Sequence, residues 1–112
     1  MLEALWSVEF VSNTHSIGAG VAVFETGRVL GGDSSFMYVG DYKTENGIVH
    51  SNIHVTKYSN INNMQSIFGP LTSFNLKVSG AVDPQTMVLT GTMIEQPQLQ
   101  ITIKAIRRVE LP

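Results

Sequence analysis

Short runs in which apolar and polar residues alternate recur along the chain, and this pattern limits most strongly what the chain can fold into. Near the N-terminus, Trp6, Val8 and Phe10 alternate with Ser7 and Glu9. A period of two residues is typical of a β-strand with one buried face. Further strand-like runs occur at 18–25, 28–32, 36–42, 48–58, 74–79, 87–93 and 99–105. The sequence therefore predicts an all-β, mainly antiparallel protein.

Turn-forming residues separate these runs. The segment TENG, Thr44 to Gly47, contains an Asn-Gly pair, and both residues tolerate the positive φ of a type I′ turn. Thr26-Gly27 and the segment DPQT, Asp83 to Thr86, separate two further pairs of runs. We expect a β-hairpin centred on Asn46-Gly47, with its second strand running from Ile48 to Tyr58.

About eight antiparallel strands are predicted in 112 residues, and closing such a sheet removes its exposed edges. An interior formed by about eight strands is just filled by side chains or holds one small ligand. Glycines inside the strand runs permit the bends that tight curvature requires: Gly18, Gly20, Gly40, Gly80 and Gly91. We expect one small up-and-down barrel domain over residues 1–112, and a two-sheet sandwich is the alternative.

One segment departs from the period of two. In residues 58–70, the apolar residues Ile61, Met64 and Ile67 or Phe68 recur at helical spacing. A Ser-Asn pair precedes them and can cap a helix, and a Gly-Pro pair follows and can end it. The pattern predicts a single short helix.

The strand at 18–25 is apolar on both faces. Phe24 and the residues in step with it form one face, and Ala19, Val21 and Val23 form the other. A strand that is apolar on both sides is normally covered on both sides. One cover is the barrel core, and the other is either the short helix or a second subunit, so Ala19, Val21 and Val23 are the candidate dimer face.

Composition excludes several kinds of function. Seven basic and nine acidic residues give a net charge of −2 without a cluster of either sign, which argues against direct nucleic-acid binding. The absence of cysteine excludes disulfides and thiolate chemistry. The opening residues MLEALWSVEF predict neither a secretory signal nor a membrane span, so a cytoplasmic location without membrane contact is expected. A charged content of 14% is low for a small monomer and hints at a covered surface.

His50 and His54 are the most obvious candidate metal ligands. On a helix they would share one face, but the run 48–58 is predicted to be a strand, where a four-residue step covers about 13 Å. Zinc–nitrogen bonds are only about 2 Å long, so the two imidazoles are not expected to reach one ion. We predict a solvated strand face and no metal site.

A catalytic site is not predicted either. His15 in SNTHS and Asp33 in GGDSS could be combined with a serine on paper, but no placing motif supports the arrangement. Serine, asparagine and aspartate in such segments are typical of turns that bond their own backbone. Arg107 and Arg108 are expected to lie at a solvated strand end. We therefore expect a non-enzymatic protein without a cofactor.

The N-terminal half carries a further signal in the segments WSVEFVSN, GAGVAVFETGRVLGGDSSFMYVGDYK and HVTKY. These resemble the GrlR-like family, small negative regulators of type III secretion gene expression. The resemblance rests on Ser12-Asn13 after Phe10, the Gly18-x-Gly20 strand, GGDSS and Tyr38-x-Gly40, and covers about the first sixty residues. It implies a calycin-like (lipocalin-like) barrel with a short helix, a homodimer and no catalysis. It further implies protein–protein interaction in which a transcriptional activator is sequestered.

Two functions remain open after the sequence is read. In the first, the hairpin tip formed by Asp41, Lys43, Glu45 and Asn46 binds a protein partner. Lys43 to Gly47 corresponds by position to the acidic partner-binding loop that the resemblance implies. In the second, the barrel interior binds a small molecule or a lipid. Its pocket would be lined by aromatic residues, which would otherwise pack a solid core: Trp6, Phe10, Phe36 and Tyr38.

Overall fold

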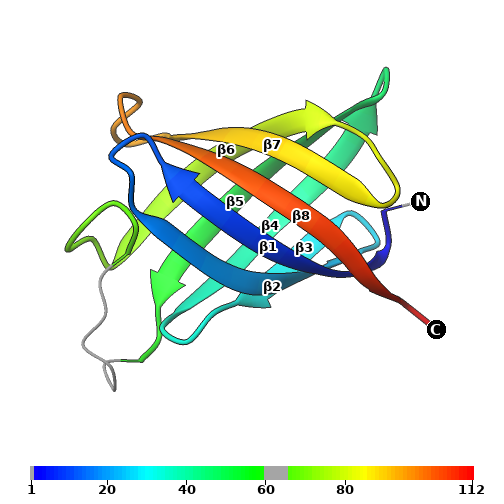
Figure 1. Ribbon diagram of the computed structural model, residues 1–112, viewed down its shortest axis with the longest axis horizontal. Helices are drawn as coiled ribbons and strands as arrows, with labels where there is room; N and C mark the ends of the chain where they lie inside the picture. Colours follow the sequence, from blue (N-terminus) through cyan, green and yellow to red (C-terminus); the bar gives the residue numbers. More distant parts are fainter. Residues whose placement is uncertain (1, 60–65) are drawn as a thin grey trace.

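The computed structural model describes residues 2–59 and 66–112, and its eight antiparallel strands close into a barrel (Figure 1). Each strand pairs with the next along the chain, and the last pairs with the first. The predicted all-β up-and-down barrel is confirmed, and the sandwich alternative is wrong. The strands are β1 (Ala4–Ser12), β2 (Ile17–Glu25), β3 (Arg28–Gly32), β4 (Phe36–Glu45), β5 (Ile48–Lys57), β6 (Ser73–Ala81), β7 (Thr86–Met93) and β8 (Gln100–Glu110).

The predicted Asn46-Gly47 turn is confirmed. Glu45 pairs with Ile48, and the two residues between them have φ values of 54° and 78°, as a type I′ turn requires. Thr26 and Gly27 form the β2–β3 turn in the same way, with φ values of 51° and 79°. The β4–β5 hairpin projects past the neighbouring strands at one corner of the barrel (upper right in Figure 1).

Alternation along the strands separates the interior of the barrel from its outer face, because successive side chains of a strand point in opposite directions. Trp6, Val8 and Ala105, for example, are buried inside, whereas Glu9 and Lys104 are exposed outside. The register between β1 and β8 shifts between Leu5 and Trp6. Such a bulge increases the local bend and twist at the seam where the last strand meets the first.

One end of the barrel is closed by its own N-terminal segment. Leu2 is buried, and its carbonyl oxygen accepts a hydrogen bond of 2.9 Å from Nε1 of Trp6. The guanidinium of Arg107 lies 5.9 Å from the centroid of the indole ring. The side chain of Arg107 is only 14% exposed, so its expected place at a solvated strand end is wrong.

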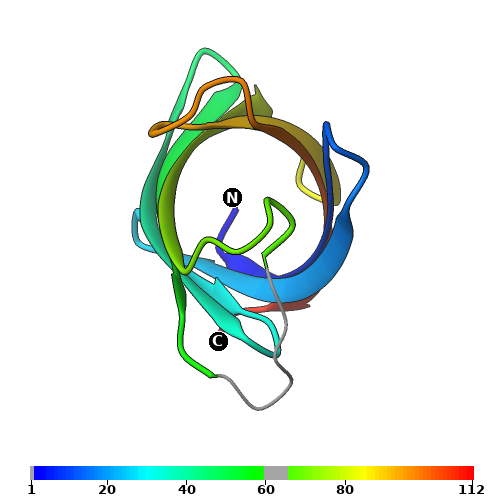
Figure 2. The same ribbon diagram turned by 90° about the vertical axis from the view of Figure 1, so that its left-hand side faces the viewer.

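The other end is covered by the segment Ser66–Leu71, which folds across the opening (Figure 2). Ile67, Phe68 and Leu71 pack against the core. The amide of Gly69 donates to the Ser66 carbonyl at 3.0 Å, which makes a tight turn. The predicted short helix falls largely outside the described residues, Ile61 and Met64 included. Among the residues that are described, none is helical, and no helix is long and apolar enough to cross a membrane.

Candidate functional site

A cavity of about 100 Å³ lies inside the barrel and reaches the covering segment Ser66–Leu71. All eight strands contribute to its walls, which are almost entirely apolar. Of the four residues predicted to line a pocket, Phe10, Phe36 and Tyr38 do line it. Trp6 does not, because it packs at the closed end beneath Arg107.

Two glycines of β2 leave room for aromatic rings at this end. A Cβ atom at Gly18 would lie 2.4 Å from the ring of Phe10, and one at Gly20 would lie 2.9 Å from the hydroxyl of Tyr38. Real Cβ atoms essentially never come this close to another atom, so the ring of Phe10 and the hydroxyl of Tyr38 lie over bare backbone. The rings of Phe10 and Tyr38 meet edge to face, with centroids 6.4 Å apart, an arrangement favoured by aromatic pairs.

Four of the described residues that line the cavity have polar side chains: Asp33, Tyr38, Ser51 and Ser66. The hydroxyl of Ser51 donates to the carbonyl of Asp41 at 2.6 Å, and that of Ser66 donates to the carbonyl of Gly69 at 3.0 Å. Both hydroxyl protons are therefore used by the backbone. Asp33 and Tyr38 remain as the polar groups that can face a ligand.

Asp33 is held in place by the turn between β3 and β4. Its Oδ1 accepts hydrogen bonds from the amides of Ser35 at 2.9 Å and Phe36 at 2.8 Å, so it forms an Asx turn as its sequence context predicted. Its Oδ2 accepts the hydroxyl proton of Tyr38. The hydroxyl of Tyr58 donates to the backbone carbonyl of Asp33 at 2.6 Å.

The phenol of Tyr38 is kept neutral by its surroundings. Burial raises its pKa well above the ordinary value for tyrosine, and the hydrogen bond to Asp33 and the negative charge of that carboxylate raise it further. Tyr38 therefore remains a hydrogen-bond donor to Asp33 throughout the physiological range. The sequence identified Tyr38 and Asp33 separately but contained no signal that they form a pair.

Ser35 is a polar residue of the same turn that sequence reasoning missed. It is buried, and its Oγ has no hydrogen-bond partner within residues 2–59 and 66–112. Buried hydroxyls are normally hydrogen-bonded, so an unpaired one beside Asp33 marks this end of the barrel as unusual.

A second feature lies on the outer face of the barrel, where apolar residues of five strands stand directly opposite one another. Pairing in register produces one continuous row: Val109, Leu5, Val23, Leu30 and Val39. A parallel row contains Val21 and Met37, which flank Gly32. Val21 is 48% exposed, Val39 46% and Val109 57%. We call the following residues the outer band: Leu5, Val21, Val23, Leu30, Met37, Val39 and Val109.

The outer band contains two of the three residues expected at a dimer face. Val21 and Val23 belong to it. Ala19 lies outside it, two residues from Val21 along β2 and opposite Glu9. Charged residues border the band on both sides. Arg28 stands between Glu25 and Asp41 in the register on one side; Glu9 is paired with Lys104 on the other. Both signs of charge are present in this border.

The hairpin tip is fully accessible. Lys43, Glu45 and Asn46 are exposed, and Asp41 lies on the same outer face of β4, two residues further from the turn. The carbonyl of Gly47 accepts a hydrogen bond of 2.9 Å from the amide of Val82, so the β6–β7 connection braces the turn. The four predicted residues therefore form one exposed strip with mixed charge.

The two histidines of β5 lie on the outer face, as predicted. His50 stands between Lys43 and Ser79 in the register. His54 bonds through Nδ1 to Oδ1 of Asn75 at 2.9 Å. Within the described part of the chain, no three histidine, aspartate or glutamate side chains are grouped to hold a metal ion.

The structure does not bring His15, Asp33 and a serine together as a catalytic set. His15 is exposed in the β1–β2 loop, with a φ of 69°. The hydrogen bonds that Asp33 makes within the described residues go to its own turn, Tyr38 and Tyr58.

The geometry therefore supplies an apolar cavity with one polar pair, and an apolar outer band with a charged border. Comparisons with known protein families and with curated proteins find no match to this chain.

Proposed function

We propose that this protein is a non-enzymatic interaction protein that pairs with a second copy of itself through the outer band. The observation that carries the proposal is the unbroken apolar row across five neighbouring strands, with Val39 and Val109 about half exposed. Contiguous apolar patches on soluble proteins usually mark interaction sites. An apolar centre surrounded by charged residues is also the usual anatomy of a protein–protein interface.

The closed barrel limits how such a protein can bind a partner. Each strand is paired on both sides, so a partner cannot be added as a further strand at a sheet edge. Recognition must instead use side chains on the outer face or in the projecting hairpin. A border that carries both signs of charge suits a two-fold interface, in which the same patch meets itself and each residue faces its complement.

The hairpin tip is the second part of the proposal. Three of its residues, Lys43, Glu45 and Asn46, lie beyond the border of the outer band and are offered to a different protein, whereas Asp41 belongs to that border. The resemblance to GrlR-like regulators suggests the kind of partner, a transcriptional activator of type III secretion genes that is held away from its promoter. In this chain Glu45 is the only acidic residue from Lys43 to Gly47, so the partner's site should carry both signs of charge.

Light scattering during size-exclusion chromatography tests the pairing. The expected mass is twice that of the 12.2 kDa chain, and Val21→Lys should yield the single-chain mass because a buried, unpaired charge opposes association. Val88→Lys is the matched control, since Val88 is 59% exposed on the outer face of β7, outside the band. A wild-type mass of one chain at every concentration, or equal dissociation by both variants, would contradict the proposal.

The hairpin is tested separately: the purified protein is used as bait in a lysate of its native host, and the proteins that it captures are identified and quantified. The Lys43→Glu, Glu45→Lys double variant should lose the captured regulator at low and moderate salt, while Val21→Lys retains it. Loss of the same protein from a Lys77→Glu control, which changes an exposed charge on β6 outside the hairpin and the outer band, would show that binding does not depend on the hairpin in particular and would contradict this part of the proposal.

A further inference from the structure

We propose that the barrel cavity binds one small neutral molecule that has an apolar body and a single hydroxyl group, of the size of phenol or a six-carbon alcohol. The hydroxyl would donate to Asp33 Oδ2 or bond to Tyr38, and the apolar body would fill the space beneath Ser66–Leu71. This inference is independent of the outer band and of the hairpin, which face away from the cavity.

The size and lining of the cavity determine the apolar part. Its volume is about 100 Å³, and a dry apolar cavity of about 150 Å³ in another protein holds one benzene molecule. Within the described residues, the hydrogen bonds of Ser66, Phe68 and Gly69 in the covering turn connect only residues of the turn itself, and the turn is held to the barrel by the packing of its apolar side chains. A displacement of this turn by a fraction of an ångström enlarges the space without breaking any pairing between strands.

The hydrogen-bonding capacity of the polar pair determines the head group. A carboxylate has about four acceptor sites, and Asp33 uses two of them on Oδ1 and one on Oδ2. With partners counted among the described residues, one acceptor site on Oδ2 and the acceptor capacity of the Tyr38 hydroxyl remain. Because the hydroxyl hydrogen of Tyr38 is already donated to Asp33 in a hydrogen bond, the pair offers only acceptors, and a ligand that donates a hydrogen bond satisfies it.

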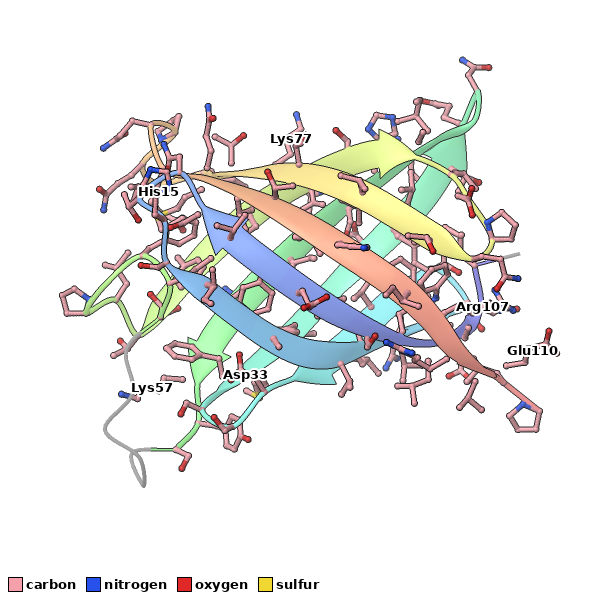
Figure 3. The ribbon with its side chains drawn as sticks, viewed as in Figure 1. His15, Asp33, Lys57, Lys77, Arg107 and Glu110 are labelled. Atoms are coloured by element: carbon pink, nitrogen blue, oxygen red, sulfur yellow. The ribbon has the colours of Figure 1, made fainter. Side chains whose placement is uncertain are left out.

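Charge excludes the other common head groups. Among the described residues, the cavity lining contains the carboxylate of Asp33 and no lysine, arginine or histidine, so a carboxylate ligand would be repelled and left unpaired. Lys57 lies at this end of the barrel but extends outward, away from the strands, and Arg107 lies at the opposite end (Figure 3). An ammonium head group would lose its hydration among apolar walls. The carboxylate of Asp33, which already accepts three hydrogen bonds, would rarely offset that cost.

Three probes of similar shape separate these contributions: phenol, toluene and benzoate. We would titrate each into the ¹⁵N-labelled protein and follow the amide signals by NMR. Phenol should shift the signals of Gly20, Phe36 and Tyr38 in a saturable way. Toluene should bind about fivefold more weakly, because one hydrogen bond contributes about 1 kcal/mol, and benzoate should not saturate.

The wild-type comparison alone can overturn the inference. Absence of saturable shifts with phenol would show that the cavity is only a packing defect. Equal affinity for toluene would remove the role of Asp33 and Tyr38, and equal affinity for benzoate would contradict the argument from charge.

Two variants locate the site. Ile53→Phe places a larger side chain on the cavity wall and should abolish phenol binding. Asp33→Asn keeps the Asx turn, because asparagine also bonds the following amides, and should reduce the preference for phenol over toluene. Unchanged phenol affinity in a folded Ile53→Phe protein, judged from its amide spectrum, would place the binding elsewhere and contradict the proposal.

Discussion

The guanidinium of Arg107 lies over the indole of Trp6, with its central carbon 5.9 Å from the ring centroid, and Trp6 in turn donates its Nε1 proton to the carbonyl of Leu2. The contact closes one end of the barrel with a large side chain that is fully buried. The opposite end has bare glycine backbone beside Phe10 and Tyr38. The barrel is therefore solid at one end and hollow at the other.

Removing the indole should weaken the solid end strongly. Trp6→Ala should lower the free energy of unfolding by about 3–5 kcal/mol, because a large cavity is left in the core. Trp6→Phe should cost less, but it leaves the Leu2 carbonyl without its donor, which costs about 1–3 kcal/mol. Trp6 is the single tryptophan, so urea unfolding should be followed by circular dichroism. An equally small loss for both variants and for the control Val88→Ala, at an exposed position outside the outer band, would contradict this account.

Two glycines should respond to alanine in different ways. At Gly47, φ is +78° and an added Cβ would meet no atom within 4 Å, so Gly47→Ala should cost only the conformational penalty of about 1–2 kcal/mol. At Gly40, the Cβ would lie 2.1 Å from the carbonyl oxygen of Asn52, and the β4–β5 backbones would have to separate. Gly40→Ala should therefore destabilise more than Gly47→Ala in urea unfolding, and the reverse order would show that β4 tolerates the shift.

Alkaline pH should reveal the buried phenol of Tyr38. Its pKa in the folded protein is raised, chiefly by burial, so the folded state keeps a proton that the unfolded state releases above about pH 10. The free energy of unfolding should fall as pH rises beyond that point, because the unfolded state binds fewer protons there. Urea unfolding from pH 8 to 11 should show a shallower fall for Tyr38→Phe. Parallel curves for wild type and variant would indicate that other groups account for the fall.

Acidic pH should report on the contact between Glu95 and Asn75. The pKa of Glu95 is lowered, first by the backbone amide of Asn75 at 3.0 Å and then by its side-chain amide at 2.7 Å. A lowered pKa means that the contact stabilises the fold above the ordinary pKa of glutamate and is lost as pH falls through the folded value.

An NMR titration of the Glu95 carboxyl carbon tests this. Asn75→Ala should raise the pKa only part of the way to its ordinary value, because the backbone amide remains. Asn52→Ala, also on the outer face of the barrel, should leave it unchanged. A full return to the ordinary value in Asn75→Ala would mean that the side-chain amide is the main cause.

The local features of the fold could be predicted because each depends on a few neighbouring residues. The alternation of Trp6, Val8 and Phe10 indicates a strand and identifies its buried face. The Asn46-Gly47 turn follows from the backbone freedom of two residues, and the Asx turn at Asp33 follows from one short side chain. None of these features depends on distant parts of the chain.

The candidate site could be predicted only in part, because alternation tells inside from outside but not depth along the barrel. Trp6 and Phe10 share a face of β1, yet Trp6 fills the closed end and Phe10 lines the cavity. Depth depends on how each strand is shifted against its neighbours, which no single run of residues encodes.

By itself, then, the sequence determined the strands, the turns and the inward faces, since these follow from a period of two residues and from local backbone freedom. It favoured a barrel but left a sandwich open, and the pairing of β8 with β1 decided between them. Only the tertiary structure decided that Tyr38 meets Asp33, that Arg107 covers Trp6 and that Val23, Leu30 and Val39 join into one outer band. Each of these depends on the register between strands, and register is a property of the whole closed sheet.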